Sequence, residues 1–71
     1  MNTKMLKYLV DLSIKPSGYV DVEEFLKRYP DTPQLRRELK TLMDSCYLMV
    51  IYADDEIDTI NVDRAGYKHF S

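Results

Sequence analysis

The sequence is poor in the residues that build disulfides, metal centres and nucleophilic sites. It contains one cysteine, one histidine and no tryptophan among 71 residues. A single cysteine excludes an internal disulfide and is typical of a protein in a reducing compartment. One cysteine and one histidine cannot supply the ligands of a protein zinc site. We therefore expect no metal, no cofactor and a cytoplasmic location.

Long apolar runs and catalytic motifs are lacking as well. No stretch of 18 apolar residues exists, and the N-terminus lacks the charged segment and apolar core of a signal peptide. We therefore expect no membrane partner. The sequence has no glycine-rich phosphate loop and no nucleophile–base pair at a recognisable spacing, so we expect the chain not to be an enzyme.

Excess positive charge is also missing, although apolar residues are plentiful. Ten Lys and Arg stand against 12 Asp and Glu, and the net charge is −2. Nucleic-acid binders usually carry a basic face, so the overall charge gives no support to DNA binding.

An apolar fraction of 45% indicates a folded chain, and the length allows one domain, 1–71.

Apolar spacing and capping residues predict two helices in the first part of the chain. The first runs from a cap at Thr3 to about Ile14, where Pro16 and Gly18 follow. Asp21 begins a second helix, which continues to about residue 29. The segment 19–20 between these helices is short, and we expect it to add a rung beside a later hairpin.

A third helix is predicted over residues 33–46. Thr32 is a preferred N-cap and Pro33 a preferred first residue. Polar residues occupy one side of this helix. The other side is apolar, and we expect Cys46 to be buried there as a small hydrophobic residue; this side comprises Leu35, Leu39, Leu42, Met43 and Cys46.

Two apolar segments around an acidic turn predict a β-hairpin, with strands over 47–53 and 57–62. The turn is Asp54-Asp55-Glu56, and Asp58 follows it. Both faces of the first strand are apolar, with Leu48, Val50 and Tyr52 on one face and Met49, Ile51 and Ala53 on the other. One face must pack on the helices. The other needs a cover, either from the rest of the chain or from a partner such as a second copy.

This order of elements resembles the winged helix-turn-helix family. The ending 60–70 is similar to the strand followed by Thr-x-x-Gly-x-x-Tyr-Leu that closes small winged-helix proteins of Gram-positive bacteria and their prophages. Asp63 stands at the position of the capping Thr, Gly66 matches the Gly, and Tyr67 and Phe70 supply apolar anchors. The resemblance implies an α+β fold: a three-helix core, a two-stranded wing and a short C-terminal helix over 64–70.

The resemblance also implies a DNA-binding regulator of bacterial or prophage type. In such proteins the third helix usually enters the major groove, and the wing touches DNA nearby. The residues carried over to that role are Gln34, Arg36, Arg37, Lys40 and Thr41. Two features depart from the pattern: Asp44 lies on the same side of the helix, and the wing tip is acidic where phosphate contacts need Lys or Arg.

A second hypothesis keeps the scaffold and changes the partner. A protein-interaction module or inhibitor would use the acidic turn and the apolar strand, through Leu48, Val50, Tyr52, Asp54, Asp55 and Glu56. Each charged group also has a simpler explanation, since a charged helix side is often merely solvated and Asp is a preferred turn residue. The clustered carboxylates lack the spacing of a calcium loop. The sequence leaves both hypotheses open.

Overall fold

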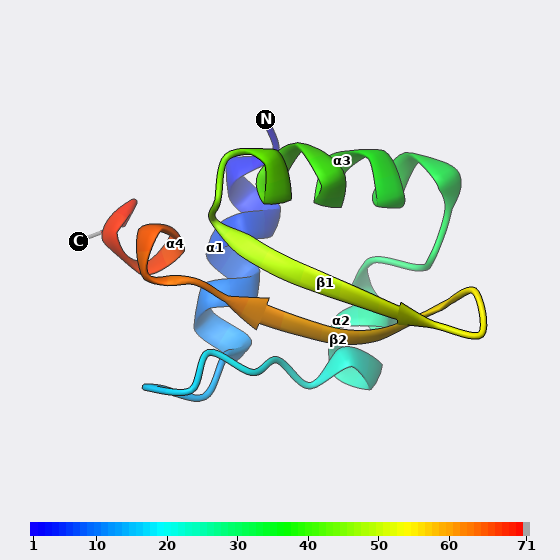
Figure 1. Cartoon of the computed structure of the whole chain (residues 1–71), viewed down its shortest axis with the longest axis horizontal. Helices are drawn as coiled ribbons and strands as arrows, with labels where there is room; N and C mark the ends of the chain where they lie inside the picture. The colour runs from blue at the N-terminus through cyan, green and yellow to red at the C-terminus, as the bar shows by residue number, and fades with distance from the viewer. Residues whose placement is uncertain (71) are drawn as a thin grey trace.

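Four helices and one antiparallel hairpin make up residues 1–70, the part of the chain that the computed structural model describes. The elements are α1 (Thr3–Leu12), α2 (Val22–Arg28), α3 (Pro33–Asp44), β1 (Leu48–Ala53), β2 (Glu56–Val62) and α4 (Arg64–Lys68). Helix α3 runs along β1, α2 contacts β2, and α1 contacts α4 (Figure 1). The expected α+β class is therefore confirmed.

Local capping explains where the first three helices begin. The side chain of Asp21 accepts a hydrogen bond from the backbone N–H of Glu24 at 3.3 Å, and that of Thr32 accepts one from Leu35 at 3.1 Å. Both predicted caps are confirmed. The cap of α1 is Asn2, one residue before the predicted Thr3. Asp63 precedes α4, but its side chain makes no capping hydrogen bond.

Three helices end earlier than the apolar spacing predicts. Helix α1 ends at Leu12, and Ile14 leaves the helix to form a β-bridge with Tyr19. Helix α4 ends at Lys68 instead of residue 70.

Helix α3 ends at Asp44 instead of residue 46. Cys46 has a φ of 64°, in the left-handed region, where the chain turns from α3 into β1. Its side chain is exposed, so the prediction of a buried cysteine is wrong.

The segment that follows α1 pairs with the outer edge of β2 and so adds a short third row of backbone to the hairpin. Strands β1 and β2 pair antiparallel from Leu48–Val62 to Ala53–Glu56, with an irregularity between Ile51 and Tyr52. On the far side of β2, the Val20 N–H donates to the carbonyl of Ile60 at 3.0 Å. The Val62 N–H donates to the carbonyl of Gly18 at 2.7 Å. The expected rung beside the hairpin is therefore confirmed.

The core lies between the helices and one face of this sheet. The largest side chains that are completely buried in it are Met5, Leu6, Leu9, Phe25, Leu39, Leu42 and Ile60. Leu48 and Val50 of β1 point into it and are 2% and 6% exposed. No helix of residues 1–70 covers the β1 residues on the opposite face of the sheet, where Met49 and Ile51 are each 48% exposed.

Candidate functional site

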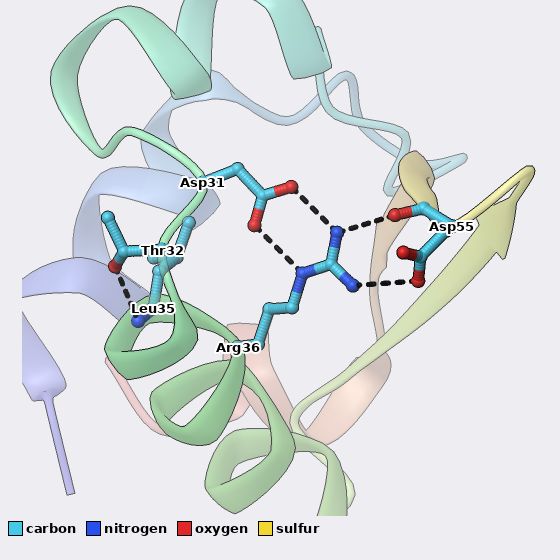
Figure 2. A network of polar contacts seen from close by, with 5 residues as sticks. All are labelled: Asp31, Thr32, Leu35, Arg36 and Asp55. Carbon is cyan, nitrogen blue, oxygen red and sulfur yellow. Dashed lines mark hydrogen bonds and ion pairs between the residues drawn. The ribbon is translucent and has the colours of Figure 1, made fainter.

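Arg36 joins α3 to the hairpin turn. Its Nε and Nη2 atoms donate to the two carboxylate oxygens of Asp31, each at 2.8 Å (Figure 2). Nη2 also donates to the backbone carbonyl of Asp55 at 2.7 Å, and Nη1 to the Asp55 carboxylate at 3.5 Å. The guanidinium carbon lies 4.9 Å from the centre of the Tyr52 ring. This predicted DNA-contact residue is therefore already engaged within the chain.

The pair of Arg36 and Asp31 is partly shielded from water. Their side chains are 33% and 30% exposed, whereas the side chain of Asp55 is 99% exposed. The hydrogen bonds from Arg36 hold the pKa of Asp31 below its ordinary value, and they raise the pKa of Arg36 further above its own. The carboxylate of Asp55 stays solvated, so its carbonyl oxygen is the group that fixes the turn.

We expect Arg36→Gln to remove part of the acid sensitivity of folding. Pairing lowers the pKa of Asp31 in the folded state, so its stabilising contribution is present above the unfolded value of about 4. That contribution is lost as the pH falls through the lower folded-state pKa. Urea unfolding of both proteins should therefore show a stability gap at neutral pH that shrinks as the pH is lowered. Arg37→Gln is the control, and a gap that does not change with pH would contradict the expectation.

Four of the five predicted DNA-contact residues lie on the exposed side of α3. Gln34 and Arg37 are exposed, and the side chain of Arg37 makes no ion pair or hydrogen bond with the described residues. Lys40 pairs with Asp44 at 3.2 Å, but both side chains are largely in water. Such a pair contributes little and can be displaced. Thr41 donates from Oγ1 to the carbonyl of Arg37 at 3.1 Å.

The burial of β1 corrects the protein-binding hypothesis. Leu48 and Val50 belong to the core and cannot offer their side chains to a partner. Tyr52, two residues further along β1, is 41% exposed, and its ring lies under Arg36 of α3. The large apolar residues that β1 exposes are thus Met49 and Ile51 in addition to Tyr52.

A row of three apolar side chains and one asparagine crosses the exposed face of the sheet. The β-bridges pair Ile14 with Tyr19 and Tyr19 with Asn61, and the hairpin pairs Asn61 with Met49. Directly paired residues point to the same face, so these four side chains lie side by side. Ile14 is 67% and Tyr19 55% exposed. We call Ile14, Tyr19, Met49 and Ile51 the outer apolar face.

A basic pocket borders one end of this face. Its volume is about 640 Å³, and it shares Asn61 with the row just described. Its charged members are three cations and one carboxylate, and we call the whole set the basic pocket: Lys15, Pro16, Ser17, Asn61, Val62, Asp63, Arg64, Tyr67 and Lys68. Lys15 lies with its Nζ 5.2 Å from the centre of the Tyr67 ring. The acidic turn lies at the other end of the molecule (Figure 1).

Neither a metal-binding cluster nor a membrane-spanning helix occurs in residues 1–70. Within this range, no three His, Cys, Asp or Glu side chains are grouped so that they could hold a metal ion. None of the helices in it has the length and apolar character needed to cross a membrane.

No protein-family model, no curated protein and no solved structure matches this chain.

Proposed function

We propose that this chain is a small winged-helix DNA-binding protein of regulatory type, which contacts DNA through the exposed side of α3. The observation that carries the proposal is the uncovered group Gln34, Arg37, Lys40 and Thr41 on that side. Glutamine can pair with adenine through two hydrogen bonds in the major groove, and the cations on this side can neutralise DNA phosphates. Arg37 has no competing partner in the described part of the chain.

The winged-helix assignment is supported by the order of the elements and by the position of the hairpin turn. Arg36 holds that turn beside the first part of α3. In this assignment Arg36 positions the wing and does not contact DNA. The residues proposed to contact DNA are therefore Gln34, Arg37, Lys40 and Thr41.

The acidic turn limits how strongly one copy can hold DNA. Asp55 lies next to Arg36, and Asp54 and Glu56 flank it in the chain. Only Arg37 and Lys40 on this side are placed to neutralise phosphates. Each phosphate contact contributes about −0.9 to the slope of log K against log salt, so we expect a slope of about −2 per copy.

Fluorescence anisotropy with a labelled generic duplex at several salt concentrations tests the proposal. We expect binding tighter than about 10⁻⁴ M at low salt. Arg37→Ala should weaken binding and change the slope by about one unit, from about −2 to about −1. Lys27→Ala on α2 is the matched control, because it removes an exposed cation from another helix. Binding weaker than 10⁻⁴ M at low salt, or equal loss in the two variants, would overturn the proposal.

A second candidate function, a protein-interaction module, is favoured by the outer apolar face. Met49 and Ile51 are each 48% exposed on one face of the sheet, and apolar side chains gathered on an exposed face can mark a protein-interaction site. In this reading the acidic turn attracts a basic partner. It differs from the sequence-based version in using Met49 and Ile51 where that version used Leu48 and Val50.

A further inference from the structure

We infer that the outer apolar face is the surface on which two copies of this chain pack against each other, with the acidic turn of each copy seated in the basic pocket of the other. The inference concerns a different face from the exposed side of α3. It therefore stands independently of DNA binding.

The apolar centre of this surface provides the attraction. The four side chains of the outer apolar face come from the segment after α1, the short stretch 18–20 and β1, and all are about half exposed or more. Two sheets that pack face to face lie about 10 Å apart with their side chains interleaved. A second copy supplies an identical apolar face, so both copies bury theirs in one contact.

The charged ends of the surface indicate that its partner is a second copy, because one end is acidic and the other is basic. The acidic turn and the basic pocket lie at opposite ends of the molecule, whose longest dimension is 32 Å (Figure 1). When a twofold axis lies in the plane of the contact and crosses the long dimension at the middle of the outer apolar face, the second copy runs in the opposite direction. Each acidic end then meets a basic end, and this happens twice in the same dimer. A parallel arrangement would bring acid against acid.

The side chains at the two ends are available for this exchange. The Asp55 carboxylate is 99% exposed, and its contact with Arg36 is long at 3.5 Å. Its backbone carbonyl keeps the turn in place even when the carboxylate moves. In the basic pocket the guanidinium of Arg64 makes no hydrogen bond or ion pair with the described residues, and the Lys15 ammonium lies over the Tyr67 ring without an ion pair to any of them. Both cations can therefore receive carboxylates of a second copy.

Sedimentation equilibrium of the full chain tests the inference. Wild type should form a dimer of the 8.4 kDa chain at high protein concentration, and added salt should weaken it. A turn variant (Asp54→Lys with Glu56→Lys) and a pocket variant (Lys15→Glu with Arg64→Glu) should each associate at least about ten-fold more weakly. An equimolar mixture of the two variants should recover dimers, because each contact then again joins opposite charges.

Further variants separate the parts of the inference. Ile51→Ser should weaken the dimer while leaving the far-UV circular dichroism spectrum unchanged, and Lys27→Glu on α2 should leave association unchanged. A wild-type monomer at millimolar concentration, open-ended polymers, or a variant mixture that stays monomeric would overturn the inference. The anisotropy assay with Ile51→Ser reports on α3 separately, so failure of DNA binding and failure of dimerisation are distinguishable.

Discussion

Gly18→Ala should leave most of the chain unfolded at room temperature. Gly18 has a φ of 81°, which costs about 1–2 kcal/mol for a residue with a side chain. An added Cβ would also lie 2.3 Å from the carbonyl oxygen of Val62. That oxygen belongs to the backbone of β2, and the two residues are already joined by the Val62 N–H bond to the Gly18 carbonyl. Relieving the overlap must therefore shift a strand, at about 1–3 kcal/mol more.

The combined cost is comparable to the roughly 3–5 kcal/mol that a domain of this size has in total. Circular dichroism during thermal and urea unfolding measures it. Ser17→Ala is the neighbouring control, since it removes two exposed hydrogen bonds, to the Ile14 carbonyl and from the Tyr19 N–H at 3.5 Å, and should cost less than Gly18→Ala, at about 1 kcal/mol. A cooperative Gly18→Ala transition within a few degrees of wild type would show that the backbone yields more easily than this.

Phe25→Ala should also exceed what the domain can tolerate. Phe25 is completely buried, and it is the one buried residue of α2. Its ring stacks on Tyr29 with centroids 5.3 Å apart and lies 6.3 Å from Tyr8. Truncating a buried phenylalanine costs about 3–5 kcal/mol, because apolar contacts are lost and a cavity remains.

Urea unfolding followed by circular dichroism would measure this loss. Phe25→Leu keeps most of the volume and should cost about 1–2 kcal/mol, so it separates a packing effect from a general intolerance of the position. Lys27→Ala, two residues further on the exposed side of α2, should be nearly neutral. A Phe25→Ala protein that unfolds at the wild-type urea concentration would mean that α2 contributes little to the core.

The features that sequence could predict are those set by residues close together in the chain. Asp21 and Thr32 act on an amide three residues ahead, and Pro33 suits the first turn of a helix by its own ring. The hairpin turn follows from two aspartates, which accept positive φ more readily than most residues and have φ of 51° and 63°. The class and order of elements therefore follow from short-range chemistry.

The errors arise where a distant contact decides the outcome. Both faces of β1 are apolar, so alternation alone could not tell that Val50 faces the core and Met49 the solvent. Cys46 continues the apolar spacing of α3, but the chain must reverse there to start β1, and the residue turns outward. The row that links Ile14 to Met49 exists only because 18–20 pairs with β2.

The sequence-based site assigned Arg36 to DNA and missed its contact with Asp55 of the hairpin turn, and the consequence of that contact reaches beyond the site. Arg36 and Asp55 are 19 positions apart, so their contact closes a loop that contains most of α3 and all of β1. Closing such a loop restricts the relative motion of everything inside it. The hairpin turn and the first turn of the helix should consequently open and close as one cooperative unit. A ligand that displaces the turn therefore also loosens the start of α3.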